Sequence, residues 1–545
     1  MSSDIPTLNG PKTTGAAPFT NEPFEDFTDP ETRRAMESAL ALVEGHLGRE
    51  YPMVIGGHRV LTAEKIVSIN PAHPSQIVGT HQEPDAAQAQ TAVAAALAAF
   101  PAWSRQTVTQ RAELLLRVSQ RVRERKFEFC AWLTFETGKN FAEADADVGE
   151  TIDFLEFYAR EALRLDHATT PIQFPGEKNV LRYLPLGVGV VIPPWNFPLA
   201  IMAGMTAAAI VTGNTVVLKP SVDAPTIAAK FFEVLEEAGM PDGVVNLCAG
   251  SGPVFGSALV EHPEVRFIAF TGSKAVGLEI HEKAARQRPG QIFIKRTILE
   301  MGGKDAILVD ADCDLDAAVE GVAASAFGFN GQKCSACSRA IVDADLYDLF
   351  LDRLQTRVAA IHVGAPRENA AAGPVISKKA FDRVKQYLAI GRTEGRLVLG
   401  GEAIEKDGGY YIAPTIFADV APSARIAQEE IFGPVLVVIK SRSFDEALEI
   451  ANGTEYGLTG AVYSLRQQHL DRAAREFHVG NLYFNRKCTG AMVGAHPFGG
   501  FNMSGTDSKA GGADYLLLFT QAKSIATYLL ATSPETELAE QGFGL

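Results

Sequence analysis

Cysteine is scarce in this chain: six occur in 545 residues, at the irregular positions 130, 248, 313, 334, 337 and 488. Secreted proteins stapled by disulfides carry a much denser set, so no disulfide framework is expected. The N-terminus also lacks the basic start and apolar core of a secretory signal. The sequence therefore predicts reduced thiols and a cytoplasmic location.

Basic charge is in deficit as well, with 50 Lys and Arg against 65 Asp and Glu and a formal net charge of −15. A nucleic-acid partner needs clustered Lys and Arg to follow its phosphates, and the sequence shows no such cluster. We therefore expect a small-molecule partner and no nucleic acid.

Charged residues are missing from residues 184–218, a run long enough to span a bilayer. Eight prolines and glycines interrupt it: Pro185, Gly187, Gly189, Pro193, Pro194, Pro198, Gly204 and Gly213. This punctuation favours a strand, a loop, a buried helix and a second strand within a core. We expect no membrane association.

The length exceeds that of one ordinary core, and the sequence pattern predicts the α/β class. Residues 1–50 are expected to form an arm with a helix from 30 to about 47, and the acidic end 533–545 is expected to fray. Residues 85–163 are expected to be helical, including 86–100 and 117–129. The first α/β region is predicted to have strands at 187–192, 214–218, 244–248 and 266–270 and a helix at 225–238. A second α/β region is predicted at 306–483, with helices near 317–327 and 347–361 and a strand at 435–439.

Cys334 follows Lys333 in a loop that contains Gly331. A free thiol is only about 3% ionised at pH 7, and a neighbouring cation raises that fraction, so Cys334 is a candidate nucleophile. Two other interpretations stay open: an inert buried thiol, and a redox or metal pair with Cys337. A second cysteine pair is missing, and no metal site is predicted.

Two further residues suit acyl chemistry. Glu300 precedes Gly302 and Gly303 and is a candidate general base, the alternative being an exposed loop glutamate. Asn196, within Pro-Trp-Asn-Phe-Pro at 194–198, follows a predicted strand, where its amide can donate to an oxyanion. The alternative there is a structural turn braced by proline.

Features suited to a nucleotide are less specific. Gly272 and Ser273 join a predicted strand to a helix expected from Lys274, so free N–H groups and the Ser273 hydroxyl can meet a pyrophosphate. Lys219 ends another predicted strand, and the glycines at 250–256 only approximate a dinucleotide fingerprint. A dinucleotide is the hypothesis that these turns support.

Taken together, these segments resemble the aldehyde dehydrogenase superfamily, in order from about residue 50 to 530. The shared segments are PWNFP at 194–198, KP at 219–220, FTGS at 270–273 with VG at 276–277, Glu300 with GGK at 302–304, GQKC at 331–334, EEIFGPV at 429–435 and PFGG at 497–500. The resemblance implies a Rossmann-type dinucleotide-binding domain (51–163 and 187–300), an α/β catalytic domain (301–504), and a small oligomerisation element with a tail (164–186 and 505–545). It also implies a homodimer or larger homo-oligomer.

The resemblance further implies a role for individual residues. Cys334 is the implied nucleophile, Glu300 the general base, and Asn196 with the Cys334 amide the oxyanion hole. The implied cofactor-binding residues are Trp195, Lys219, Gly272, Ser273, Glu430 and Phe432, with NAD as the cofactor. Many NAD-preferring relatives have a glutamate three residues after the lysine, whereas this chain has Val222, so NADP use stays open.

The residues around Cys334 resemble the branch that oxidises L-glutamate 5-semialdehyde, the open form of 1-pyrroline-5-carboxylate, to L-glutamate in proline degradation. The implied substrate-binding residues are Lys333, Ser335, Gly490, Ala491 and Phe498, and a cation with backbone N–H groups suits an α-carboxylate. The chain is too short to hold an added flavin-dependent proline dehydrogenase domain, so the resemblance implies the form with the single dehydrogenase activity. Three alternatives remain: a dehydrogenase for another carboxylated semialdehyde such as succinate semialdehyde, a cofactor-binding scaffold, and a thiol esterase.

Overall fold

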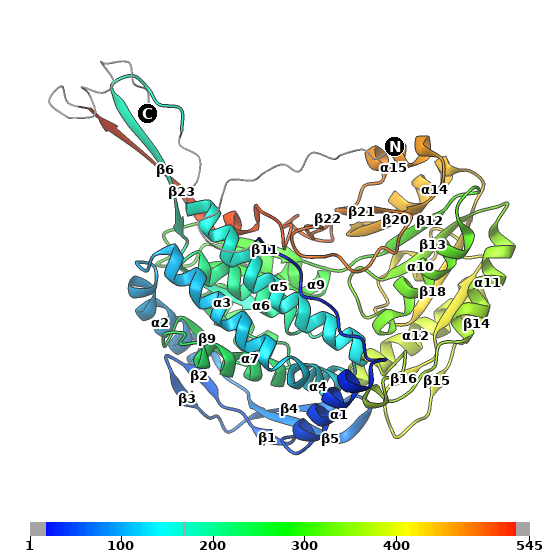
Figure 1. Cartoon of the computed structure of the whole chain (residues 1–545), viewed down its shortest axis with the longest axis horizontal. Helices are drawn as coiled ribbons and strands as arrows, with labels where there is room; N and C mark the ends of the chain where they lie inside the picture. Colours follow the sequence, from blue (N-terminus) through cyan, green and yellow to red (C-terminus); the bar gives the residue numbers. More distant parts are fainter. Residues whose placement is uncertain (1–17, 167–170, 530–545) are drawn as a thin grey trace.

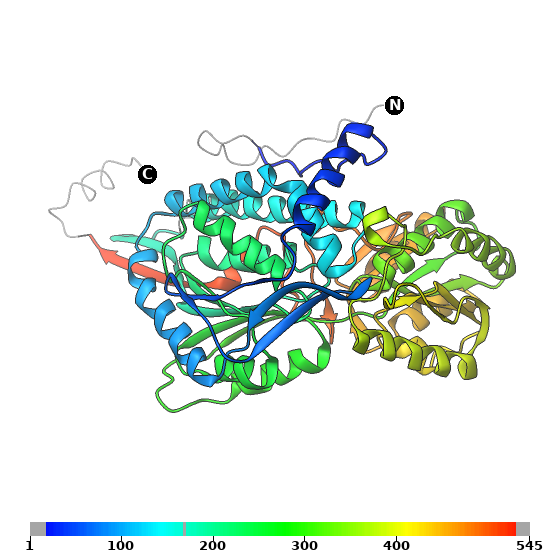
Figure 2. The ribbon, with the colours of Figure 1, turned by 90° about the horizontal axis from the view of Figure 1, so that it is seen from below.

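The computed structural model describes residues 18–166 and 171–529, which form two α/β lobes side by side (Figures 1 and 2). Each lobe contains a seven-stranded sheet. The first 17 residues of the predicted arm, residues 167–170 and the end 533–545 lie outside the described residues.

The first sheet has the strand order β11-β10-β7-β8-β9-β2-β3, and its strands from β11 to β9 are parallel. Successive strand residues point to opposite faces, so Val190 packs with α2, α8 and α9 while Val191 packs with α3 to α7. Helices thus cover both faces, as a parallel sheet requires. The elements are β2 (Met53–Ile55), β3 (His58–Val60), α2 (Ala86–Trp103), α3 (Val108–Glu124), α4 (Lys126–Thr137), α5 (Phe141–Asp166), β7 (Val188–Ile192), α6 (Ala200–Val211), β8 (Thr215–Leu218), α7 (Thr226–Glu237), β9 (Val245–Leu247), α8 (Ser257–Glu261), β10 (Val265–Thr271), α9 (Lys274–Ala285) and β11 (Arg296–Glu300).

The second sheet has the order β14-β17-β18-β13-β12-β20-β21 and is parallel except for its edge strand β14. Helices α10 and α11 pack on one face, and α12, α14 and α15 on the other. The elements are β12 (Asp305–Val309), α10 (Leu315–Phe327), β13 (Cys337–Asp343), α11 (Tyr347–Ala359), α12 (Lys378–Glu394), β14 (Arg396–Leu399), β17 (Thr415–Ala418), α13 (Arg425–Gln428), β18 (Val435–Ser441), α14 (Phe444–Asn452), β20 (Thr459–Tyr463), α15 (Gln467–Glu476) and β21 (Asn481–Phe484).

The strands and helices predicted between 187 and 439 are present, with ends that differ by one to two residues. The helix of the arm, α1 (Pro30–Glu44), ends before the predicted residue 47, and the predicted helix at 117–129 is two helices that break at Arg125. A three-stranded sheet was not predicted from the sequence; it consists of β1 (Arg49–Glu50), β4 (Lys65–Asn70) and β5 (His73–Gln82). The β2–β3 hairpin was not predicted either, although Gly56 and Gly57 are typical of such a turn.

The lobes meet where the carboxyl ends of the first sheet's strands face the amino ends of strands in the second sheet. The first sheet contributes the carboxyl ends of β7, β8, β10 and β11, and the second contributes the loops that enter β13 and β18. Four residues, 301–304, join β11 to β12 and carry the chain from one sheet to the other. Ligands of parallel α/β sheets bind at the carboxyl edge, so this junction is where a site is expected.

A two-stranded ribbon projects from the first lobe (Figure 1). It pairs β6 (Glu177–Pro185) with β23 (Thr520–Tyr528) in antiparallel register over nine residue pairs. The uncharged run 184–218 is divided among β6, β7, α6 and β8, as the prolines and glycines predicted. Among the described residues, no helix combines the length and apolarity needed to cross a membrane.

Prediction on stability. Asp147 and Lys139 form an ion pair at 3.1 Å with both side chains fully buried, and Asp147 also accepts from the Ala200 N–H at the start of α6. Replacing Asp147→Ala leaves the Lys139 charge unpaired, and we expect the free energy of unfolding to fall by about 3–5 kcal/mol. The Asp147→Asn variant keeps the acceptor for Ala200 and should lose less. Thermal melting checks this, and an unchanged melting temperature for the alanine variant would contradict it.

Candidate active site

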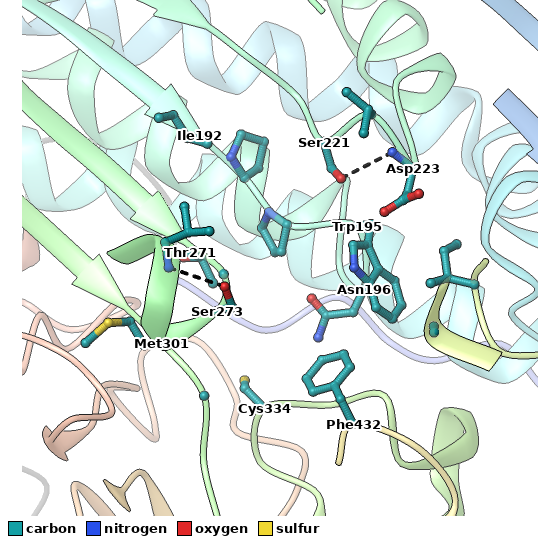
Figure 3. A pocket seen from close by; sticks show the side chains of 18 of the residues that line it. Ile192, Trp195, Asn196, Ser221, Asp223, Thr271, Ser273, Met301, Cys334 and Phe432 are labelled. Carbon is teal, nitrogen blue, oxygen red and sulfur yellow. Dashed lines mark hydrogen bonds between the residues drawn. The ribbon is translucent and has the colours of Figure 1, made fainter. Parts of the chain in front are cut away.

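A cavity of about 400 Å³ lies at the junction of the two lobes (Figure 3). That volume lies within the range of about 300–1,000 Å³ of pockets for small ligands and cofactors. Eight of the residues proposed from the sequence line it: Trp195, Asn196, Lys219, Gly272, Ser273, Cys334, Glu430 and Phe432. The structure therefore brings together every predicted cofactor residue and two of the three predicted catalytic residues.

Cys334 is partly buried in the wall of this cavity. Burial raises the pKa of its thiol well above the ordinary range, and the carboxyl groups of Asp305 and Glu300 act in the same direction. The expected increase in the thiolate fraction is not seen, because burial outweighs the neighbouring Lys333, whose ammonium pairs with Glu143 at 2.7 Å. Cys334 is thus a neutral thiol in this state.

The loop before Cys334 has an unusual backbone. Phe329, Asn330 and Gly331 all have positive φ, at 47°, 55° and 65°. Such strain persists only where the surroundings enforce it, and the Asn330 amide donates to the Pro374 carbonyl while Gln332 accepts from the Ile376 N–H. Cys334 therefore follows a loop that is held in place by hydrogen bonds with the segment before α12.

Asn196 follows β7 at the turn that leads into α6, and its side chain points toward Cys334 (Figure 3). One of its amide hydrogens donates to the Gln332 carbonyl at 3.1 Å, which ties it to the nucleophile loop. Among the described residues, the Cys334 N–H has no acceptor. The second Asn196 hydrogen and the Cys334 N–H are therefore two donors available to an oxyanion beside the thiol.

Glu300 ends β11 but does not line this cavity; it lines a separate one of about 30 Å³ with Phe154, Tyr158 and Met205. Burial raises the pKa of its carboxyl to about 8, against the lowering effect of hydrogen bonds from Ser508. Its second oxygen is buried without a hydrogen-bond partner in the described chain. A carboxyl with this pKa can exchange a proton with water near neutral pH.

The remaining cavity wall suits a dinucleotide. Burial lowers the pKa of Lys219 to about 8, and its ammonium donates to the Gly250 carbonyl at 2.8 Å. Ser273 caps α9, whose first-turn N–H groups have no partner within the helix and attract anions. Burial raises the pKa of Glu430, which accepts from the Gly303 N–H. The ring of Phe432 lies edge-on to Trp195, with ring centres 5.4 Å apart.

The five predicted substrate residues do not line this cavity: Lys333, Ser335, Gly490, Ala491 and Phe498. Lys333 pairs with Glu143, and the Ser335 carbonyl accepts from the Cys488 thiol. Phe498 exchanges two backbone hydrogen bonds with Ala510. The next residue, Gly499, lies close to Glu300, because a Cβ added to Gly499 would be 3.1 Å from the Glu300 carboxylate. The predicted substrate residues therefore lie outside the cavity that holds the predicted cofactor residues.

The sequence profile of the aldehyde dehydrogenase family matches residues 60–525. The chain belongs to the aldehyde dehydrogenase family. This confirms the resemblance inferred from the seven sequence segments and the predicted fold class.

Three similar proteins illustrate the resemblance. The 1-pyrroline-5-carboxylate dehydrogenase of Geobacillus thermodenitrificans is 56% identical over 93% of this chain and 99% of its own length. A crystal structure of 1-pyrroline-5-carboxylate dehydrogenase from Thermus with bound NAD has a TM-score of 0.93 and 52% identity, and covers 94% of this chain and all of that one. The proline utilization A protein of Bdellovibrio bacteriovorus has the same TM-score at 44% identity, over 96% of this chain and 54% of that chain.

Two residues of this aldehyde dehydrogenase site were missed in the sequence. Glu143 lies on α5, 190 positions before its partner Lys333, and Ser508 lies 208 positions after Glu300. No spacing in the sequence connects residues that far apart, and only the fold brings them together. The Cys334–Cys337 metal alternative finds no support, because the described residues hold no group of three or more His, Cys, Asp or Glu suited to a metal ion.

Prediction on the nucleophile loop. A Cβ at Gly331 would lie 2.3 Å from the Gly433 carbonyl oxygen, where the φ of 65° is also unfavourable for other residues. We expect Gly331→Ala to displace the loop and reduce kcat/KM by about 100-fold or more, because small displacements of reacting groups cost that much. Gly408→Ala is the matched control, since its φ of 70° is similar but no atom lies within 4 Å. Equal activity of both variants would refute this account.

Proposed function

We propose that this protein oxidises L-glutamate 5-semialdehyde to L-glutamate with NAD+, the second step of proline degradation. The observation that carries the proposal is the pair of opposite charges beside the nucleophile, Lys333 and Glu143, 2.7 Å apart. An α-amino acid presents one carboxylate and one ammonium, and can exchange partners with such a pair. Relatives at 56% identity named 1-pyrroline-5-carboxylate dehydrogenase support the same substrate.

Succinate semialdehyde is the less suitable substrate. It carries a carboxylate for Lys333 but no ammonium, so Glu143 would lose its partner to the substrate and gain none. A polar group left unpaired in a site costs binding free energy, typically about 1–3 kcal/mol and more for a charge. The pair therefore favours a zwitterionic substrate, with Ser335, Gly490, Ala491 and Phe498 proposed as its other contacts.

The chemistry follows from groups already described. Cys334 gives up its thiol proton to water, its sulfur attacks the aldehyde carbon, and the resulting oxyanion accepts from the Asn196 amide and the Cys334 N–H. Bound NAD+ supplies the hydride acceptor, and loss of hydride leaves a thioester on Cys334. Glu300 then takes a proton from water as the water attacks the thioester, and the acid is released. This last step requires the carboxylate to turn from its own small cavity toward Cys334.

The cavity residues fit NAD. We propose that Lys219 and Glu430 bind the two riboses, that Gly272, Ser273 and the start of α9 bind the pyrophosphate, and that Trp195 and Phe432 flank the nicotinamide. A buried ammonium and a buried carboxylate that line one cavity are donors and acceptors for hydroxyl groups. Val222 lines the same cavity at the position where many NAD-preferring relatives have a glutamate. A glutamate there would repel the 2′-phosphate of NADP, and valine does not, so the proposal includes the use of NADP.

We also propose a cytoplasmic homodimer or larger homo-oligomer with the domain division given by the family resemblance. All six cysteines lie in the described part of the chain and none is in a disulfide, which suits a reducing compartment. The β6–β23 ribbon projects from the lobe and leaves strand edges that another subunit can cover. The two seven-stranded sheets support a dinucleotide-binding domain over 51–163 and 187–300 and a catalytic domain over 301–504.

Prediction on the substrate. Formation of NADH with 1-pyrroline-5-carboxylate should exceed that with succinate semialdehyde, and Cys334→Ala should abolish both. Glu143→Gln should raise the KM for the zwitterionic substrate by about tenfold or more, since it removes a charge-assisted hydrogen bond, while the KM for succinate semialdehyde should not rise. Steady-state absorbance assays check this. Equal or better turnover of succinate semialdehyde by the wild type would sink the substrate assignment.

Prediction on pH. Glu300 acts as a base only when ionised, so hydrolysis of the thioester should accelerate as the pH rises through about 8. Glu300→Gln should release one NADH per active site in a burst and then stop. Ser508→Ala removes a hydrogen bond that lowers the Glu300 pKa, so its profile should shift to higher pH. Rapid-mixing assays from pH 6.5 to 9.5 measure this, and a flat wild-type profile would be the contrary result.

A further inference from the structure

The described part of the N-terminal arm before α1 lies along α5 (Figure 1). Phe19 packs edge-on to Phe157 with ring centres 5.3 Å apart, and the Glu22 N–H donates to Asp153 at 2.7 Å. Further along, the Glu25 N–H donates to Asp145 at 2.8 Å. The arm is therefore fixed to α5 by side chains spread over more than three turns of the helix.

Asn21 connects this arm to a second element. Its side-chain amide donates to Asp153 on α5 at 2.8 Å and to the Val493 carbonyl at 3.1 Å. The neighbouring Gly494 packs against Phe19 and Phe157, since a Cβ there would lie 3.2 Å from each ring. The loop 489–494 is thus held against α5 through the arm.

The same loop carries Gly490 and Ala491, the proposed donors to the substrate carboxylate. Within the described chain neither N–H donates to a protein acceptor, so both are available to a ligand. At its start the loop is tied by Arg486, whose guanidinium donates to the carbonyls of Thr489 and Gly490 at 3.0 Å. At its far end the Gly494 N–H donates to the Gly511 carbonyl, and Asn21 holds Val493.

We infer that Asn21 is a positioning residue for the substrate: through Val493 it fixes the loop 489–494, so that the Gly490 and Ala491 N–H groups meet the α-carboxylate of the amino-acid substrate. The inference rests on the proposed function. It makes the arm part of the apparatus that recognises the amino-acid end, because Asn21 holds Val493, which lies two residues after Ala491.

The direct test is Asn21→Ala, with Thr20→Ala as control because Thr20 is an exposed neighbour on the same arm. We expect Asn21→Ala to raise the KM for L-glutamate 5-semialdehyde by about tenfold, the equivalent of roughly one net hydrogen bond. The KM for NAD+ and the activity toward propanal, which has no amino-acid end, should not change. An unchanged KM for the semialdehyde, or an equal loss with propanal, would overturn the inference.

A charge swap separates loop positioning from simple anchoring of the arm. In the double variant Asn21→Asp with Asp153→Asn, the new amide on α5 can donate to the new carboxylate on the arm, but Val493 receives no donor. We expect a melting temperature near that of the wild type with the KM still raised; recovery of the KM would show that only anchoring matters. A wild type that does not oxidise the semialdehyde would instead defeat the proposed function, and this inference with it.

Discussion

The passage of the backbone from the first sheet to the second is the constraint on which this active site depends. Gly302 and Gly303 occupy it, and a Cβ would lie 2.3 Å from the Glu430 carboxylate at the first and 2.5 Å from the Cys334 carbonyl at the second. The backbone therefore passes between Glu430 and the Cys334 loop so closely that only a hydrogen atom fits in place of a side chain at Gly302 and Gly303. Because Glu300 directly precedes this passage, one short segment positions the proposed base, the proposed nucleophile Cys334 and the proposed cofactor contact Glu430.

Charge in the site is arranged around this passage. The carboxyl groups of Asp305, Glu300 and Glu430 all raise the pKa of Cys334, and burial raises the pKa of each in turn. A positively charged ligand in the cavity would reverse part of that effect, since an opposite charge favours the thiolate. The cationic nicotinamide ring of bound NAD+ would act in this direction, whereas its anionic pyrophosphate would not.

Local patterns in the sequence were sufficient for the buried elements and for the residues at strand ends. The strands β7, β8 and β10 read as apolar runs bounded by glycine or proline, and each leads directly to a cavity residue such as Asn196, Lys219 or Ser273. The partly buried sheet of β1, β4 and β5 was not predicted, because β4 pairs with register shifts and mixes exposed with buried positions. The Glu143–Lys333 pair and the Ser508–Glu300 hydrogen bond depend on tertiary contacts, which one sequence does not reveal.

The protonated state of Cys334 also bears on how the protein survives oxidants. Peroxide and electrophilic metabolites react with thiolates and only slowly with neutral thiols. An irreversible oxidation of Cys334, the proposed nucleophile, would inactivate the enzyme. The raised thiol pKa would thus slow the oxidation of Cys334 until a ligand changes the surrounding charge.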